Sequence, residues 1–314
     1  MTTGADLPHL HGGLVLTDGG LETCLIFHDG VDLPHFAAFM LLRSEAGRAT
    51  LRRYYEPYLQ IAQKDGRGFI LESPTWRASA DWAGRLGVSD AELAELNGAA
   101  IRLMQDLRDE YGGRVSPLVV SGCVGPRGDG YDAGELMTAE AAQAYHAEQI
   151  AAFVAAGADM IAAITMTNVP EAIGLARAAQ AQGAPVAISF TVETDGKLPT
   201  GQALGQAVEE VDAATGAWPA YYMVNCAHPT HFAQAFETGA PWLERVRGLR
   251  ANASRLSHQE LNDAPDLDDG DPAELGAEHA DILRRWPQIK VLGGCCGTDH
   301  RHIAAMSRAC EPAG

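Results

Sequence analysis

The sequence predicts an α/β protein that forms a single (β/α)8 barrel, and three observations lead to this prediction. Short apolar runs with the length of buried strands alternate with longer stretches of helical periodicity, and the alternation continues along all 314 residues. Eight such strand–helix units occur, which is the number that closes this kind of barrel. The turn after the first run, TDGGLET, lacks the GxGxxG spacing expected in an open doubly wound sheet that binds a dinucleotide.

Each expected strand is a short apolar run such as GFILES or AYYMVNC. The eight runs cover residues 13–18, 68–73, 115–122, 159–165, 185–192, 220–226, 246–253 and 289–296. The helices expected between them carry alanine or leucine at spacings of three and four, and Ser89 and Thr138 precede acidic residues as helix N-caps do. These helices cover residues 45–64, 89–111, 138–156, 169–182, 201–214, 229–238, 273–286 and 298–310.

The whole chain, residues 1–314, is expected to be one domain because the alternation has no break. An acidic stretch with proline and glycine, around residues 257–272, is expected to form a surface loop. Its segment DLDDGDPAE lacks the ligand spacing of a calcium-binding EF-hand loop, so calcium binding is not expected there.

The composition excludes several classes of partner. Hydrophobic residues make up 46% and charged residues 20% of the chain, as in a globular protein. The formal net charge of −18 repels phosphate backbones and anionic lipids, so nucleic acid and membranes are not expected partners. The start, MTTGADLPHLHGG, lacks the regions of a signal peptide, and we expect a cytoplasmic location. The oligomeric state stays open, and a homo-oligomer is compatible with the sequence.

Three of the six cysteines lie where two expected strands end. Cys226 ends the sixth run in YYMVNC, and Cys295 and Cys296 end the eighth in VLGGCC. The active site of a (β/α)8 barrel collects at the carboxyl ends of its strands, so we expect these thiols to converge. Adjacent cysteines rarely satisfy disulfide geometry, and cytosolic chains rarely contain disulfides. The pair is therefore expected to act as two thiolates.

Three thiolates suit a borderline-soft ion such as zinc and leave a fourth coordination position open for a substrate. A thiol bound there would lose its proton at neutral pH, which favours alkyl transfer onto sulfur. Gly293, Gly294 and Gly297 are expected to provide the backbone conformations that let both neighbouring cysteines face one ion. The alternative is three core thiols without metal, because buried free cysteines are common; the placement at two strand ends favours the metal.

Three motifs together resemble the homocysteine S-methyltransferase family, which includes betaine- and S-methylmethionine-dependent enzymes. They are LTDGGLET near the start, VNCAHP in the sixth unit and GGCCGT in the eighth, and the resemblance spans nearly the whole chain. It implies a zinc-dependent (β/α)8 barrel that methylates homocysteine to methionine. Matched by position, the implied zinc ligands, and the residues through which catalysis acts, are Cys226, Cys295 and Cys296.

The resemblance also implies substrate contacts. Asp18, Gly19 and Gly20 match the first-strand motif that holds the amino-acid part of homocysteine, and Asn225 matches the residue before the first zinc ligand. Backbone N–H groups after the first strand could receive a carboxylate. A DGG sequence after a strand is also an ordinary turn, so this alternative stays open.

The chain departs from the family at the end of its fourth strand. Many relatives have a glutamate there that binds the homocysteine amino group, and the matching residue here is Ile164. Glu72 and Glu193 each end another expected strand and are candidates to replace it, although either could be a solvated residue or part of an ion pair. Trp76 is a candidate wall for a cationic methyl donor or a packing residue.

We therefore expect methyl transfer from an activated donor to homocysteine, with Zn²⁺ as the cofactor. S-methylmethionine and S-adenosylmethionine are the favoured donors, and betaine is compatible with the sequence. Two alternatives stay open. One is methyl transfer to or from a different thiol or methylated sulfur compound, which Ile164 motivates. The other is a catalytically inactive barrel that binds zinc and a thiol.

Overall fold

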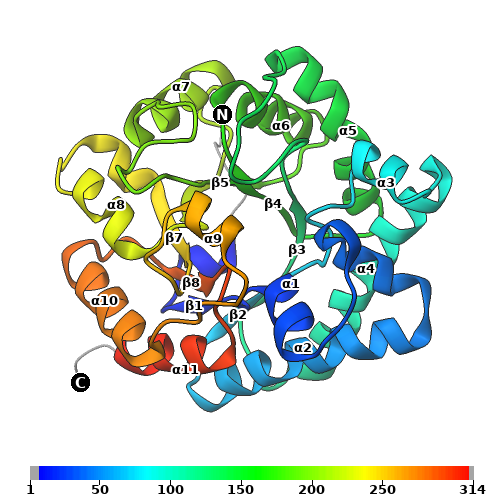
Figure 1. The fold of residues 1–314 in the computed structure, drawn as a ribbon, viewed down its shortest axis with the longest axis horizontal. Coiled ribbons are helices and arrows are strands. Elements are labelled where there is room, and N and C mark those ends of the chain that lie inside the picture. Colours follow the sequence, from blue (N-terminus) through cyan, green and yellow to red (C-terminus); the bar gives the residue numbers. More distant parts are fainter. Residues whose placement is uncertain (1–6, 311–314) are drawn as a thin grey trace.

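The computed structural model describes residues 7–310 and contains eight parallel strands, which close into a barrel in chain order. Figure 1 looks along the barrel axis and shows the ring of helices outside the strands. The prediction of a (β/α)8 barrel is confirmed. The outermost parts of the expected domain, residues 1–6 and 311–314, lie outside the described residues.

Each observed strand lies inside the apolar run that predicted it or overlaps that run and extends one or two residues past its end. The strands are β1 (Val15–Leu16), β2 (Gly68–Glu72), β3 (Leu118–Val124), β4 (Met160–Met166), β5 (Val186–Phe190), β6 (Tyr221–Asn225), β7 (Val246–Ala251) and β8 (Val291–Gly294). β1 is only two residues long and pairs with both β2 and β8, so the barrel closes through a short ladder.

Every expected helix is present, with ends that differ by a few residues. The helices are α2 (Glu45–Lys64), α4 (Asp90–Tyr111), α5 (Ala139–Ala155), α6 (Val169–Ala181), α7 (Leu204–Thr215), α8 (Pro229–Phe236), α10 (Pro272–Arg285) and α11 (His300–Ala309). The side chains of Ser89 and Thr138 accept hydrogen bonds from backbone N–H groups in the first turns of α4 and α5, which confirms both predicted caps.

Several short helical segments were not expected from the sequence. They are η1 (Pro8–Leu10), α1 (Leu21–Thr23), η2 (Cys24–His28), η3 (Pro34–Phe36), η4 (Ala38–Arg43), α3 (Ala80–Arg85), η5 (Pro241–Arg245) and α9 (His258–Asp263). Helix α9 lies inside the segment 257–272 that was expected to be a loop. Its start is stabilised by a capping box between Ser257 and Glu260, a pattern that the letters SHQE already carry.

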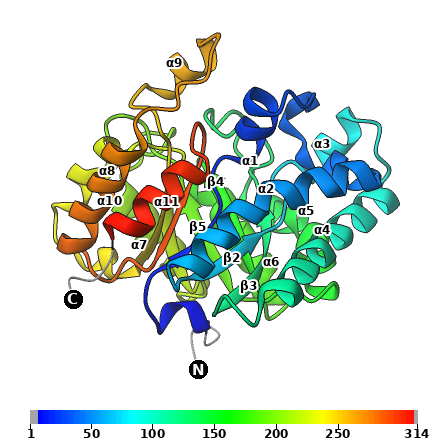
Figure 2. The same ribbon diagram turned by 90° about the horizontal axis from the view of Figure 1, so that it is seen from below.

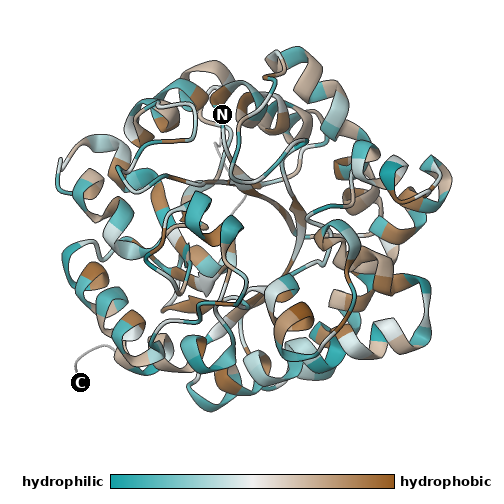
Figure 3. Cartoon of the chain, in the orientation of Figure 1, coloured by the Kyte–Doolittle hydropathy of each residue, from teal (hydrophilic) through white to brown (hydrophobic). Residues whose placement is uncertain are grey.

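The hydrophobic core has two layers, one between the strands and the helices and one inside the barrel. Apolar residues accordingly lie on the strands and the inner faces of the helices, with hydrophilic residues outside (Figure 3). Leu7 and the segment η1 close the amino-terminal end of the barrel, where buried His9 lies 3.2 Å from the Tyr221 hydroxyl. Figure 2 shows α9 at the opposite end, which is the carboxyl end of the strands.

Within residues 7–310, none of the helices combines the length and the apolar character needed to cross a lipid bilayer.

Candidate metal centre and substrate cavity

The three predicted cysteines meet at the carboxyl end of the barrel. Cys226 follows β6, Cys295 and Cys296 follow β8, and their sulfur atoms all lie within 4.8 Å of one another. The Cys226 sulfur is 2.6 Å from that of Cys295 and 3.6 Å from that of Cys296. Among the residues that the structure describes, this is the one group of three or more histidine, cysteine or acidic ligands close enough to hold a metal ion.

The donor set fits zinc chemically. Tetrahedral thiolate ligands at about 2.3 Å from an ion lie roughly 3.8 Å apart, so the 3.6 Å pair is already close to that spacing and the 2.6 Å pair must open by about 1 Å. Hydrogen bonds from the Cys226 and Cys296 thiols hold the pKa of Cys295 well below its usual range. The three cysteines together therefore favour the thiolate form of Cys295, and the thiolate is the form in which cysteine binds metals.

The glycines beside the cysteine pair act differently from one another. Gly297 has a φ of +77°, the left-handed conformation that was expected. Gly293 and Gly294 do not have positive φ values; they are needed for space. A Cβ on Gly293 would lie 2.4 Å from the Thr17 hydroxyl, and one on Gly294 would overlap the Thr298 side chain. The expectation that all three provide special backbone conformations was therefore wrong for two of them.

Asn225 holds the backbone around the cysteines and lies outside the cavity lining. Its Oδ1 accepts hydrogen bonds from the Thr165 N–H at 2.9 Å and the Ser189 hydroxyl at 2.6 Å, and its Nδ2 donates to the Thr165 hydroxyl at 2.8 Å. Thr165 and Cys226 both have positive φ values, 65° and 54°, which non-glycine residues rarely adopt. Asn225 thus fixes the strained backbone at Thr165 through hydrogen bonds and directly precedes the strained backbone at Cys226.

The DGG turn packs against the loop that carries the cysteine pair. The Gly20 N–H donates to the Thr298 carbonyl at 2.9 Å, so it is not free to bind a substrate carboxylate. A Cβ on Gly19 would lie 2.7 Å from the Thr298 carbonyl oxygen, and one on Gly20 would lie 2.5 Å from that of Cys295. Both glycines are therefore required for this close approach. Packing of the turn, without any substrate contact, explains why glycine occupies both positions.

A narrow cavity of about 80 Å³ opens beside the cysteines. It brings together most of the residues that the sequence singled out, with several that it did not. Its lining includes Asp18, Gly19, Gly20, Glu22, Tyr55, Glu72, Trp76, Cys123, Ile164, Arg250, Cys295 and Cys296. Ile164, at the position where relatives were expected to have a glutamate, thus gives the cavity an apolar wall.

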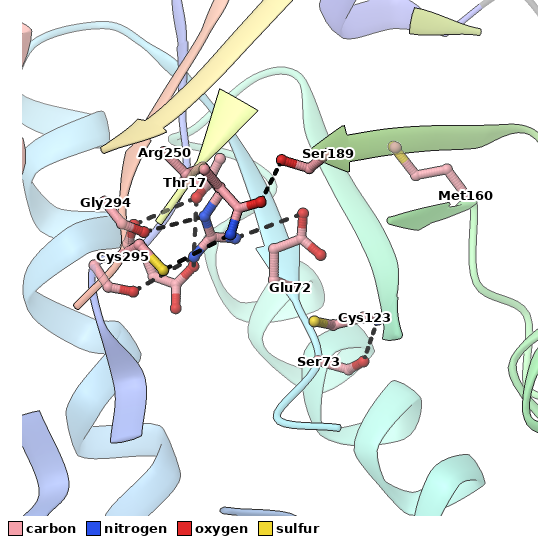
Figure 4. A network of polar contacts seen from close by, with 12 residues as sticks. Thr17, Glu72, Ser73, Cys123, Met160, Ser189, Arg250, Gly294 and Cys295 are labelled. Atoms are coloured by element: carbon pink, nitrogen blue, oxygen red, sulfur yellow. Dashed lines mark hydrogen bonds and ion pairs between the residues drawn. The ribbon is translucent and has the colours of Figure 1, made fainter. Parts of the chain in front are cut away.

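Arg250 is the principal residue that the sequence analysis missed. It donates from Nη2 to Asp18 at 2.8 Å and from Nε to the Gly294 carbonyl at 3.1 Å, and its Nη1 lies 3.8 Å from Glu72. Figure 4 shows Arg250 between Glu72 on one side and Gly294, the last residue of β8, with Cys295 on the other. A charged residue in the apolar run VRGLRANA was the available signal, because strand interiors rarely hold an unpaired charge.

Glu193 does not reach the cavity. Its carboxylate lies 3.0 Å from Nδ1 of His258 on α9, and Nε2 of the same ring lies 2.7 Å from the Cys226 carbonyl oxygen. The ion-pair alternative for Glu193 is therefore the one that the structure favours. His258 lies in the segment expected to be a loop, and nothing in the sequence indicated its position beside the cysteines.

Tyr131 covers the cysteines from the loop after β3. Its ring stacks on His258 with centroids 4.2 Å apart, and its hydroxyl donates to the Cys296 sulfur at 3.2 Å. Burial raises the pKa of Tyr131 well above its usual range, so the hydroxyl keeps its proton and can donate. Trp76 forms another wall, and the Arg77 guanidinium lies 4.0 Å from the centre of its ring.

These features define a class: a (β/α)8 barrel with a three-cysteine metal-type site at the carboxyl ends of its strands, next to a small cavity. A family model described as homocysteine S-methyltransferase matches residues 15–310. The chain therefore belongs to the homocysteine S-methyltransferase family and is a methyltransferase.

Two curated relatives illustrate the similarity in sequence. The chain is 29% identical to a homocysteine S-methyltransferase of Escherichia coli over 236 residues, which cover 70% of this chain and 73% of that protein. It is 26% identical to homocysteine S-methyltransferase 4 of Zea mays over 322 residues, which cover 96% and 91% of the two chains.

Solved structures agree with the fold. The oxidized form of the homocysteine methyltransferase MmuM from Escherichia coli superposes with a TM-score of 0.76 at 23% identity, covering 95% of this chain and 96% of that chain. The metallated form of the same enzyme gives a TM-score of 0.73 over the same shares of the two chains.

Proposed function

We propose that this protein transfers a methyl group from an activated cationic donor to the thiol of homocysteine, giving methionine, with Zn²⁺ held by Cys226, Cys295 and Cys296. The observation that carries the proposal is the convergence of these three sulfur atoms within 4.8 Å beside a cavity. When bound, the ion acts as a Lewis acid that lowers the pKa of the acceptor thiol. The metallated form known for MmuM of Escherichia coli supports a metal in this family.

The residues of the chain orient the two substrates. Tyr131 and His258 cover one side of the cysteines, the DGG turn packs against the other, and the cavity gives an acceptor a route to the sulfur atoms of Cys295 and Cys296. The cavity is far smaller than sites for drug-sized ligands, which favours a small thiol as the acceptor. Holding both reactants in line lowers the entropic part of the barrier to transfer.

The charge of the cavity favours a positively charged donor. Asp18, Glu22 and Glu72 face one arginine, Arg250, in its lining. Burial raises the pKa values of these three carboxyl groups, and a sulfonium or quaternary ammonium group beside them favours their ionised forms; such a cation is also attracted to the ring of Trp76. S-methylmethionine and S-adenosylmethionine are therefore the favoured donors, and betaine shares the same charge. Ile164 stands where many relatives have a glutamate that binds the homocysteine amino group. A thiol other than homocysteine is therefore a second candidate acceptor.

The test is the metal content of the purified protein under reducing conditions, beside two variants. We expect about one zinc per chain in the wild type, loss of zinc in Cys295→Ser, and retention in Cys310→Ser, whose cysteine lies at the end of α11. Methionine formation from homocysteine is then measured with each donor. Absence of metal from the wild type after reconstitution with zinc would remove the support for this function.

A further inference from the structure

Three carboxylates line the cavity, and they differ in how well the protein satisfies them. Asp18 is satisfied: Arg250 donates to its Oδ1 at 2.8 Å, and the Tyr54 hydroxyl donates to its Oδ2 at 3.0 Å. Glu22 is partly exposed, although burial of its carboxyl group still raises its pKa from 4.5 to about 7. Glu72 is as buried as Asp18, at 4% against 3% exposure, but one of its carboxylate oxygens has no hydrogen-bond partner.

One oxygen of the Glu72 carboxylate lies in an ion pair beyond hydrogen-bond distance, and the other has no hydrogen-bond partner. Oε1 lies 3.8 Å from Nη1 of Arg250, and Figure 4 shows this carboxylate directed toward the guanidinium. Oε2 is buried without a hydrogen-bond partner. Leaving a buried charged acceptor unpaired is costly, so such a group in a folded protein requires an explanation.

The neighbouring protein groups offer this carboxylate one hydroxyl. Ser121 is paired with Glu72 in the register of β2 and β3, and its hydroxyl lowers the pKa of Glu72, although the two side chains do not form a hydrogen bond of good geometry. One hydroxyl leaves room for further donors, since an ionised carboxylate has about four acceptor positions. Ile164, in the lining of the same cavity, is apolar and can neither donate to nor compete with this carboxylate.

We propose that Glu72 binds the primary ammonium group of the acceptor, so that the site selects aminothiols of the α-amino-acid type over thiols without an amine. Arg250 forms an ion pair with one carboxylate oxygen and leaves the other without a hydrogen-bond partner. This inference rests on the proposed function, because it assumes that an acceptor thiol reaches the three cysteines. It assigns to β2 the amine recognition that the apolar Ile164 cannot perform from β4.

The test measures thiol binding without a methyl donor. Protein loaded with Co²⁺ is titrated with homocysteine and with 4-mercaptobutanoate, which keeps the thiol and carboxylate but lacks the amine, and the sulfur-to-cobalt absorption band is followed. We expect the wild type to bind homocysteine about 10- to 100-fold more tightly, the range for a hydrogen bond to a charged group. Glu72→Gln is expected to remove this preference and to bind 4-mercaptobutanoate as the wild type does, which also shows that the variant is folded.

Glu193→Gln is the matched control, because it makes the same chemical change at a carboxylate outside the cavity lining. It is expected to keep the preference for homocysteine. A Glu72→Gln variant that keeps the preference, or a Glu193→Gln variant that loses it, would overturn the assignment and leave the proposed function intact. Failure of both thiols to change the cobalt spectrum of the wild type would overturn the assignment and the proposed function together.

Discussion

The guanidinium of Arg250 donates to the carboxylate of Asp18 at 2.8 Å, joining β7 to the turn that follows β1. Both side chains are buried, at 9% and 4% exposure. The Gly294 N–H donates to the Asp18 carbonyl at 2.9 Å in the same region. Because β1 has only two residues, these contacts reinforce the closure of the barrel, and they do so directly beside the cysteine pair.

Replacing Arg250 with methionine is expected to destabilise the protein by about 3–5 kcal/mol at neutral pH, because Asp18 and Glu72 lose their buried counter-charge. Unfolding in urea measures the change. Arg284→Met is the control: its partner is Asp281, both side chains are mostly exposed, and such pairs contribute about 0–1 kcal/mol. A loss below 1 kcal/mol in Arg250→Met would contradict the role given to this ion pair.

Replacing Glu72 with glutamine is expected to change how stability depends on pH. Burial raises the pKa of Glu72 from 4.5 to about 7, with Arg250 opposing and Asp18 adding to the rise. The folded state therefore binds this proton more tightly than the unfolded state, and the free energy of unfolding falls as pH rises from about 4.5 to 7. Glutamine does not titrate, so the free energy of unfolding of the Glu72→Gln variant does not decrease in this way as pH rises.

The variant should consequently gain stability relative to the wild type between pH 5 and pH 8, on the order of 2 kcal/mol. Denaturant unfolding of both proteins at these two pH values tests this. A difference that does not vary with pH would show that Glu72 carries no buried charge. A more stable Glu72→Gln variant at pH 8 would mean that the wild-type protein keeps Glu72 for binding although this residue lowers its stability.

The sequence predicted the barrel and its metal-type site because both follow from local patterns and one topological rule. Apolar runs such as those at 68–73 and 220–226 locate strands without knowledge of their neighbours. Closing eight parallel strands in chain order then brings every carboxyl end to one face, so Cys226 and Cys295 meet although 69 residues separate them.

The sequence did not predict which polar side chains pair inside that face. Arg250 and Asp18 are 232 residues apart, and their contact depends on strand register and side-chain direction, which composition and periodicity do not contain. His258 was missed for a related reason. It lies on α9, inside a segment whose acidic composition indicated a loop, and only the docking of that helix brings its ring next to Cys226.

Asn225→Ala is expected to lower both stability and metal affinity. The change leaves the buried Thr165 N–H and Ser189 hydroxyl without their acceptor, which costs about 2–4 kcal/mol in total. It also releases the strand end beside Cys226, and losing such a supporting contact typically weakens metal binding about 10- to 100-fold. Competition with a chelator measures the affinity for zinc.

Asn97→Ala separates these two effects. Asn97 is equally buried and bonds the Ala78 carbonyl and Gln149, away from the cysteines. We expect a comparable loss of stability with no change in metal affinity. Equal weakening of metal binding in both variants would attribute the effect of Asn225→Ala to general destabilisation.

The cover over the cysteines can be tested through Cys296 in metal-free protein. Tyr131→Ala removes both the ring that stacks on His258 and the hydroxyl bonded to the Cys296 sulfur, so iodoacetamide should modify this cysteine about 10-fold faster. Tyr131→Phe keeps the ring and removes only the hydrogen bond, so its rate should stay near that of the wild type. Peptide mass spectrometry measures the rate at Cys296, with Cys310 as the internal reference.

The comparison of the two variants identifies what the tyrosine contributes. If the ring shields the thiol, only the alanine variant reacts faster. If Tyr131→Phe reacts as fast as Tyr131→Ala, the hydroxyl alone controls the reactivity of Cys296 and the ring does not cover the site. In that case the acceptor could approach the cysteines from the α9 side as well as through the cavity beside Glu72.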